Sequence, residues 1–345
     1  MDSNIALILL QDGIVNGAVY ALLALSLVLV FSVTRVILIP QGELVAFGAL
    51  TYAALDDHRT PATLWLLGAL GIAALLSGLW SLRHGGSGRA ILGLLAETAA
   101  LPGLVIFATL ALAPLHLGVF GEAVLTLLIV TPIAPYLYRI AFQPMAEASV
   151  LVLLIAAVGV HLALMGLGLV MFGPEGFRAT GFSTGSFSLG SLTVQGQAVW
   201  VIAANLVVMA ALWAFFTFTL AGKALRATAV NRLGARLVGI SAGLSGRIAF
   251  ALAGLIGALS GILIAPLTTI YYDSGFLIGL KGFVAAIVGG LVSYPVAALA
   301  ALIVGVVESF SSFWASAFKE VIVFTLILPV LLFRSIRTPI AEDDE

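Results

Sequence analysis

The sequence predicts an all-α, polytopic membrane protein with about 8–10 transmembrane helices and some broken or re-entrant segments. Of its 345 residues, 62% are hydrophobic and 9% are charged, whereas soluble domains carry about 25% charged residues. The apolar runs are of helical length, because a membrane helix needs about 20 residues. They lack the alternating polarity of barrel strands, so we expect helices rather than a barrel.

Polar breaks divide the chain into spans, which together form one predicted membrane domain over residues 1–345. The first span is expected to be interrupted near Gln11 to Asn16, and breaks at Gly289–Gly290 and Pro295 leave the number of later crossings open. A span followed by a Pro- or Gly-marked break occurs in both 13–48 and 246–290, a faint similarity of the kind found between transporter repeats. We expect the spans at about 5–33, 36–55, 62–82, 90–113, 122–138, 150–172, 198–220 and 248–270.

Lysine and arginine predict the orientation, because cytoplasmic loops are enriched in them. Residues 221–247 contain 5 of the 15 basic residues, and no acid occurs between Glu175 and Asp273. We therefore predict that this loop is cytoplasmic, together with Arg35, Arg139 and the connection from Arg83 to Arg89. The N-terminus is then extracytoplasmic and the C-terminus cytoplasmic.

Several chemical functions are not expected. Cysteine is absent, which excludes disulfides, thiolate metal sites and cysteine nucleophiles. Gly222–Lys223 lacks the preceding glycine and the following hydroxyl of a phosphate-binding loop. We predict no catalytic residue, no metal site, no bound cofactor and no nucleic-acid partner, so the chain is not expected to be an enzyme. The histidines have no metal-ligand spacing; they are His58, His84, His116 and His161.

A polar group interrupts the apolar sequence at Pro40, Gln41, Gly42 and Glu43. Proline removes a backbone donor, and a broken helix survives in a membrane only inside protein or beside water. One interpretation is a discontinuous helix that lines a transport pathway. The other is a tight cytoplasmic turn between the first two spans, with Glu43 at the lipid headgroups near Arg35.

The basic loop has the pattern of a short amphipathic helix. Arg226, Arg232 and Arg236 recur at helical spacing, and an apolar face is expected from Leu225, Leu233, Leu237 and Ile240. The positive charge either only sets the topology or forms a docking helix for a soluble partner.

Three ionisable groups within apolar sequence are further candidates. Lys281 lies between apolar runs, and Glu308 near several serines either lines a polar path or caps a helix. His161 is expected to be a hydrogen-bonded packing residue rather than a ligand.

Three stretches together resemble a known family. They are GAVYALLALSLVLVFSVTRVILIPQGELVAFGAL, AFQPMAEASVLVLLIAAVGV, and GKALRATAVNRLGARLVGIS through GLKGFVAAIVGGLVSYPVAALAALIVGVVES. They resemble the permease family of branched-chain (hydrophobic) amino acid ABC importers, the LivH type. Leu38, Ile39, Pro40 and Gln41 depart from the family's Asn-Phe-Ala-His, which leaves amino acid specificity open. Residues 56–120 are longer and more apolar than the family pattern, and we predict an extra helix pair there.

The resemblance implies two groups of site residues. The loop that docks on the ATPase contains Gly222, Lys223, Arg226, Ala227, Asn231, Ala235 and Gly239. The substrate pathway contains Gly42, Glu43, Lys281 and Glu308, and Gln41, which departs from the family motif, is a further pathway candidate beside them.

The resemblance also implies partners. A permease of this kind lies in a bacterial inner membrane with two ATP-binding subunits, a second permease subunit and an extracytoplasmic substrate-binding protein. ATP is used by the partner subunits and no cofactor is bound by this chain. Two alternatives stay open: a proton-coupled secondary transporter that uses Glu43 or Glu308, and an ABC permease for urea, short amides or aromatic acids.

Overall fold

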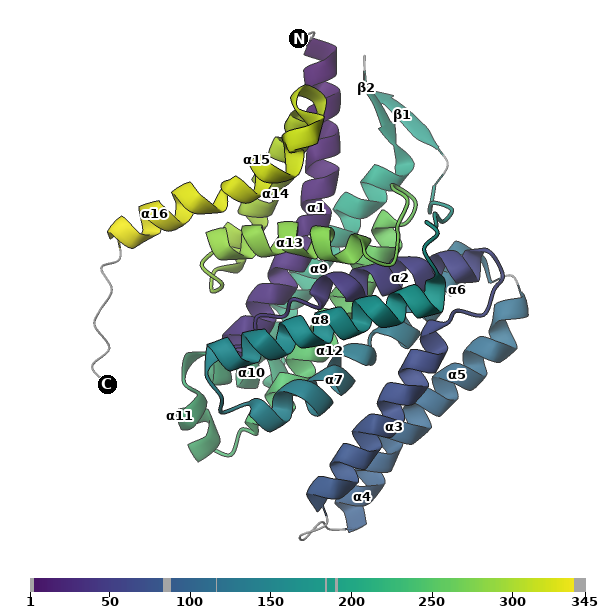
Figure 1. Cartoon of the computed structure of the whole chain (residues 1–345), viewed down its shortest axis with the longest axis vertical. Helices are drawn as coiled ribbons and strands as arrows, with labels where there is room; N and C mark the ends of the chain where they lie inside the picture. The colour runs from purple at the N-terminus through teal and green to yellow at the C-terminus, as the bar shows by residue number, and fades with distance from the viewer. Residues whose placement is uncertain (1–2, 83–87, 116, 184, 190–191, 338–345) are drawn as a thin grey trace.

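The protein is a helical bundle, shown in Figure 1. The computed structural model describes residues 3–82, 88–115, 117–183, 185–189 and 192–337. Within these ranges, 8 helices or helix runs are long and apolar enough to cross a membrane. This confirms the predicted all-α, polytopic fold. The candidate spans are Asn4–Thr34, Thr63–Trp80, Ile91–Leu115, Gly118–Met145, Val150–Phe172, Gly196–Phe218, Ala242–Ile264 and Tyr294–Trp314.

The described elements follow one another with short connections. Two π-helical turns, Ala96–Ala100 and Tyr138–Phe142, keep longer spans continuous, and β1 (Ser186–Leu189) pairs antiparallel with β2 (Leu192–Gln195). The α-helices are α1 (Ser3–Thr34), α2 (Gln41–Asp56), α3 (Thr63–Leu82), α4 (Gly88–Leu95), α5 (Leu101–Leu112), α6 (Gly118–Val130), α7 (Ile133–Leu137), α8 (Val150–Phe172), α9 (Gly196–Phe218), α10 (Leu220–Val230), α11 (Arg232–Leu237), α12 (Ala242–Ile264), α13 (Ser274–Val288), α14 (Tyr294–Trp314), α15 (Lys319–Thr325) and α16 (Ile327–Arg337).

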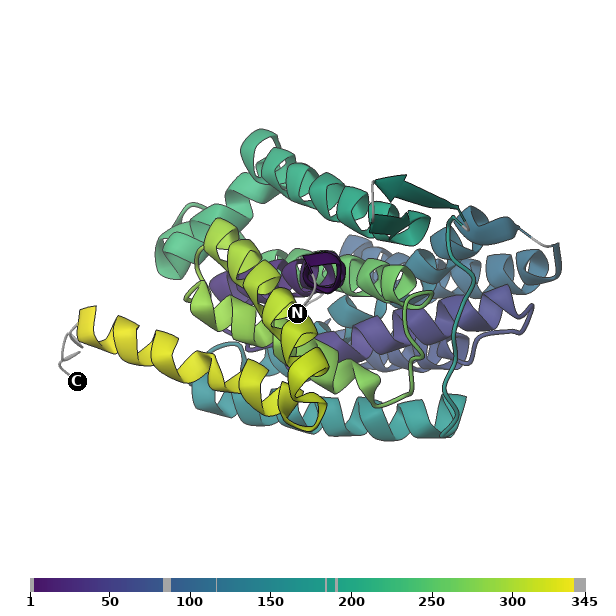
Figure 2. The same cartoon turned by 90° about the horizontal axis from the view of Figure 1, so that it is seen from above.

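Helix α1 runs through the centre of the bundle, with α8 and α9 on opposite sides of it in Figure 2. It is continuous, so the predicted interruption near Gln11 to Asn16 is wrong. The polar residues there do not break the helix, because no proline is among them and Asp12 and Asn16 line a cavity. Gly13 instead permits close packing on α14: a Cβ at Gly13 would lie 2.6 Å from the Cα of Val306.

Two short helices lie buried beside the long ones. The chain leaves α1 at Arg35 and restarts in α2 directly after Pro40, so the predicted interruption at Pro40 is present. A second long helix, α12, is likewise followed by the short helix α13. Each short helix packs on the long helix of the other pair, α2 on α12 and α13 on α1, and the two short helices also pack on each other.

We expect Gly42→Ala to destabilise the contact between α2 and α13. A Cβ at Gly42 would lie 2.0 Å from the carbonyl oxygen of Gly275, so a backbone must move. Overpacking costs about 1–3 kcal/mol, and a backbone clash belongs at the upper end. Thermal unfolding of the purified protein measures the loss. Gly159→Ala is the control, because nothing lies within 4 Å of its Cβ; equal unfolding temperatures for the two variants would contradict the prediction.

The basic segments gather at one end of the bundle. Figure 1 shows the end of α1, the helices α10 and α11 and the start of α4 at the end opposite the N-terminus. This matches the grouping of basic loops expected from the sequence. Arg83 of the predicted connection lies outside the described residues.

Candidate functional site

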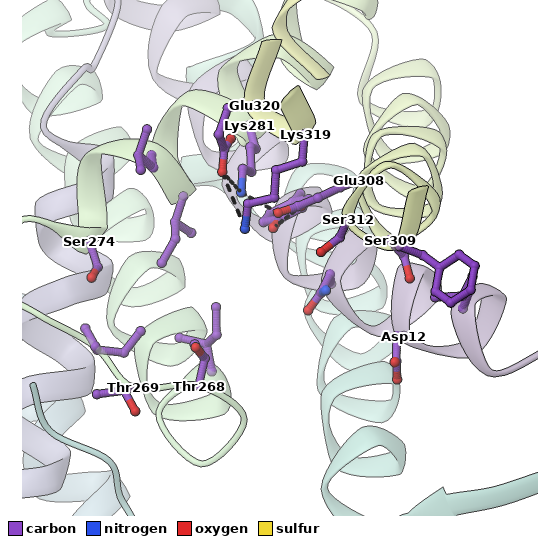
Figure 3. A pocket seen from close by; sticks show the side chains of 18 residues that line it. Asp12, Thr268, Thr269, Ser274, Lys281, Glu308, Ser309, Ser312, Lys319 and Glu320 are labelled. Carbon is purple, nitrogen blue, oxygen red and sulfur yellow. Dashed lines mark hydrogen bonds and ion pairs between the residues drawn. The ribbon is translucent and has the colours of Figure 1, made fainter. Parts of the chain in front are cut away.

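A polar cavity of about 610 Å³ lies between α1, α13, α14 and α15 (Figure 3). It is at the end of the bundle that carries the N-terminus. Its charged and polar wall includes Asp12, Asn16, Lys281, Glu308, Lys319 and Glu320, and its apolar wall includes Leu277, Ile278 and Phe313.

Lys281 and Glu308 form a buried ion pair at the base of this cavity. The Nζ of Lys281 lies 2.5 Å from Oε1 of Glu308 and 3.3 Å from Oε1 of Glu320. The hydroxyl of Tyr20 donates to the other oxygen of Glu308 at 2.5 Å. Only 5% of Lys281 and 8% of Glu308 are exposed. Because an isolated charge is costly in a membrane, these partners lower the cost of burying both side chains there.

The cluster presents both signs of charge to the cavity. Lys319 lies 3.9 Å from Glu320, so two ammonium groups stand beside two carboxylates. A second cavity of about 530 Å³ shares Asp12 and Asn16 and extends towards Thr193 of β2. The two cavities therefore form a polar region large enough for a small solute, because ligand pockets measure about 300–1,000 Å³. Paired charges beside an apolar wall suit a small zwitterion with an apolar side chain.

The other predicted pathway residues do not line this cavity. Glu43 is only 2% exposed, and its Oε1 lies 2.7 Å from Nδ1 of His161 on α8. The His161 ring stacks on Phe276, with 4.7 Å between ring centroids. Gln41 donates from Nε2 to the carbonyl of Ala253 at 3.0 Å. The alternative that placed Glu43 at the lipid headgroups is wrong, whereas the expectation of a hydrogen-bonded His161 is confirmed.

We expect His161→Leu to be far more damaging than Glu43→Gln. Removing the histidine leaves a buried carboxylate without its partner, which costs about 3–5 kcal/mol. The amide of Glu43→Gln keeps a hydrogen bond to the ring, so its cost is about 1 kcal/mol. Thermal unfolding separates the two, and membrane fractionation should show both variants inserted. Uptake should still fall for Glu43→Gln. Normal uptake by this variant would show that Glu43 is not part of the transport pathway.

The basic loop forms two short helices instead of the single helix expected from its spacing. Asn231 ends α10 and caps α11, because its Oδ1 accepts from the backbone N–H of Gly234 at 2.8 Å. Leu225 is buried, but the rest of the expected apolar face is largely exposed: 69% of Leu233 and 81% of Leu237.

A groove of about 520 Å³ runs along the surface of these two helices. The predicted docking residues that line it are Lys223, Arg226, Ala227, Asn231 and Ala235. Gly222 instead packs against Phe215, where a Cβ would lie 2.2 Å from the carbonyl oxygen, and Gly239 adopts φ +86° after α11. Exposed apolar and cationic groups beside one groove are typical of a protein-docking surface.

Helix α11 is tied to the turn that precedes α8. Arg232 donates from Nη1 to the carbonyl of Ala146 at 3.0 Å, and Arg236 forms an ion pair with Glu147. The hydrogen bond from Arg236 and its charge hold the pKa of Glu147 below its usual range. Glu147 is not conspicuous in the sequence, because its partner Arg236 lies 89 residues away.

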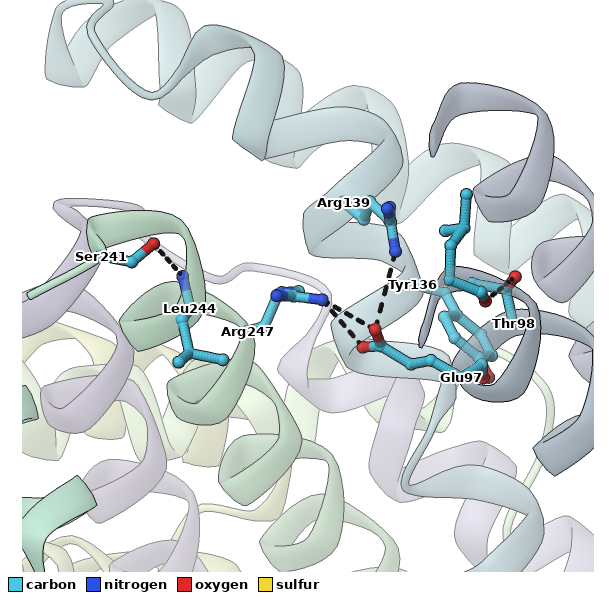
Figure 4. A network of polar contacts seen from close by, with 8 residues as sticks. Glu97, Thr98, Tyr136, Arg139, Ser241, Leu244 and Arg247 are labelled. Atoms are coloured by element: carbon cyan, nitrogen blue, oxygen red, sulfur yellow. Dashed lines mark hydrogen bonds and ion pairs between the residues drawn. The ribbon is translucent and has the colours of Figure 1, made fainter. Parts of the chain in front are cut away.

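A second polar network attaches the 56–120 segment to the rest of the bundle (Figure 4). Nη1 of Arg247 donates to both oxygens of Glu97, at 3.1 and 2.8 Å, and Arg139 lies 3.8 Å from the same carboxylate. The hydroxyl of Tyr136 donates to the backbone carbonyl of Glu97 at 2.6 Å. Arg247 is in the second turn of α12, directly after the basic loop, so this network connects the segment to the end of the bundle that carries α10 and α11.

The sequence matches the family described as branched-chain amino acid transport system / permease component over residues 9–331. The chain belongs to this family. The match covers the cavity, the Glu43–His161 pair and both helices of the basic loop.

Individual members of this family are similar over part of the chain. The high-affinity branched-chain amino acid transport system permease protein LivH of Salmonella typhimurium is 29% identical over 203 residues, which cover 56% of this chain and 65% of LivH. LivH of Escherichia coli is 28% identical over the same shares. The permease protein BraD of Pseudomonas aeruginosa is 27% identical over 57% of this chain and 66% of BraD. The similarity thus spans slightly less than two thirds of these relatives.

Proposed function

We propose that this chain is the membrane-spanning permease subunit of an ABC importer for a small zwitterionic solute, in the first place a branched-chain amino acid. The observation that carries the proposal is the Lys281–Glu308 pair at the base of a polar cavity. The groove of the basic loop lies at the opposite end of the bundle, where a partner ATPase would act. Family membership and the names of LivH and BraD support the same function.

The cavity chemistry supports the class of substrate. A substrate carboxylate would face Lys281 and Lys319, and its ammonium group would face Glu308 and Glu320. The apolar wall, including Leu277 and Ile278, would contact the aliphatic side chain.

The subunit composition is part of the proposal. Two ATP-binding subunits, a second permease and an extracytoplasmic binding protein would complete the importer in a bacterial inner membrane. This chain would contribute no covalent chemistry and bind no cofactor, and ATP would be used by its partners. Closure of the ATPases would press on α10 and α11 and switch access to the cavity, with the N-terminus extracytoplasmic and the C-terminus cytoplasmic.

Purification of the tagged full-length chain in mild detergent, with mass spectrometry of associated subunits, tests the transporter class. Uptake of labelled leucine, in competition with leucine, urea or benzoate, tests the substrate. Recovery of an ATPase and competition by leucine alone support the proposal. A chain that purifies alone, with uptake that collapses on adding a protonophore while ATP remains, would instead establish the proton-coupled transporter. Competition by urea or benzoate would reassign the substrate.

A further inference from the structure

An apolar groove of about 600 Å³ lies far from the polar cavity, near the docking end of the bundle. It is bounded by the end of α1, by α9 and α10, and by the turn between α13 and α14. Phe31, Leu212, Trp213 and Phe216 form much of its lining. The proposed transport function uses none of these four residues, although Arg226 beside them also lines the docking groove of α10 and α11.

Two cations stand at the groove, Arg35 and Arg226. Both are exposed, and neither forms an ion pair with another residue in the described part of the chain. Arg35 directly follows α1 with φ +62°, a left-handed conformation that is uncommon outside glycine, and its guanidinium lies 5.9 Å from the Phe31 ring centroid. The groove therefore joins an apolar interior to two cations that form no ion pair with any described residue.

The dimensions of the groove match one leaflet of a bilayer. From Leu25 at its inner end to Arg35, α1 rises about 15 Å, which is half of the roughly 30 Å hydrocarbon core. Arg35 follows the last residue of one candidate span, and Arg226 lies on α10, eight residues beyond the end of another span at Phe218. Both guanidinium groups are thus placed at the level of phospholipid headgroups, with apolar side chains below them. The exposed Trp213 also fits a position near that boundary.

We propose that this groove binds one anionic phospholipid, with an acyl chain along α1 and α9 and the phosphate between Arg35 and Arg226. Guanidinium groups bind phosphate oxygens with paired, charge-assisted hydrogen bonds, and basic pockets between membrane helices are known to hold anionic lipid headgroups. The cations lie at one end of the groove and the apolar side chains at the other, which matches the headgroup and acyl chain of a lipid. This arrangement favours a lipid over a protein helix. A net negative headgroup is required, because two cations stand there without a carboxylate.

Photolabelling in nanodiscs tests the proposal on the full chain with its co-purifying subunits. The probe is phosphatidylglycerol with a photoreactive acyl chain, compared with the same chain on phosphatidylcholine. We expect labelled peptides from 25–31 and 209–216, with at least a fivefold preference for phosphatidylglycerol. Arg35→Gln and Arg226→Gln should each lower that preference at least threefold. Arg59→Gln removes an exposed arginine outside the groove and should leave it unchanged.

Three outcomes would overturn the proposal. Equal labelling by both lipids would show an ordinary lipid-facing surface without headgroup recognition. If both groove variants keep the preference for phosphatidylglycerol, the headgroup is recognised elsewhere on the protein. Cross-links from 209–216 to a second permease, in place of lipid label, would show that the groove is a subunit interface. Thermal unfolding with each lipid is an independent check, since only phosphatidylglycerol should raise the midpoint and Arg35→Gln should abolish that rise.

Discussion

Replacing Lys281 with methionine is expected to abolish uptake and to cause the largest loss of stability of any single change in the cavity. The variant leaves Glu308 buried with only the Tyr20 hydroxyl as a partner. Breaking a buried ion pair from one side costs about 3–5 kcal/mol, because the remaining charge stays uncompensated. Thermal unfolding in detergent and uptake of labelled leucine measure the two effects.

A double variant separates folding from transport. Lys281→Met with Glu308→Gln removes both charges, so stability should recover to within about 1–2 kcal/mol of the starting protein. Uptake should remain at least tenfold reduced, since the cavity no longer offers the two charges. Arg59→Met is the control and should leave uptake unchanged, because it removes an exposed cation paired with Asp57 outside the cavity. Normal uptake by the double variant would mean that the pair serves only the fold.

The fold class could be predicted from the sequence because the membrane imposes it on composition. Apolar runs of helical length have few alternatives, and most predicted spans therefore agree with the structure within a few residues. Local polarity predicted less well where the helices are interrupted. The polar residues from Gln11 to Asn16 line a cavity without interrupting α1, whereas Asn231 interrupts a regular arginine pattern because its side chain caps a new helix.

The candidate site was predictable residue by residue but not as an arrangement. Lys281 and Glu308 are conspicuous as charges in apolar sequence, yet nothing in their spacing of 27 residues says that they form a pair. Glu43 and His161 are 118 residues apart, and Glu97 and Arg247 are 150 apart. Such partners are brought together by helix packing, for which a single sequence holds no direct signal. Whether Gln41, Gly42 and Glu43 belong to the pathway stays a prediction.

Reversing the charge of Arg226 is expected to uncouple the chain from the proposed ATPase partner. Arg226 is exposed, lines both the groove of α10 and α11 and the apolar groove, and forms no ion pair within the described residues, so an ATPase carboxylate can approach it from the docking side. Central arginines in interfaces contribute about 2 kcal/mol or more, and a like charge facing a carboxylate adds repulsion. Arg226→Glu should therefore weaken ATPase binding by roughly thirtyfold or more and reduce ATP-driven uptake accordingly.

Two further variants decide whether the groove itself is the docking site. Ala227→Trp fills the groove without changing any charge, so it should weaken ATPase binding even though Arg226 is intact. Arg59→Glu makes the same charge reversal at an exposed arginine outside the groove and should bind normally. Pull-down of the ATPase with each purified variant gives the comparison. If the Arg226→Glu and Arg59→Glu variants bind the ATPase equally well, the positive charge of the loop serves only to orient the chain in the membrane. That is the simpler of the two interpretations that the sequence of the loop allows.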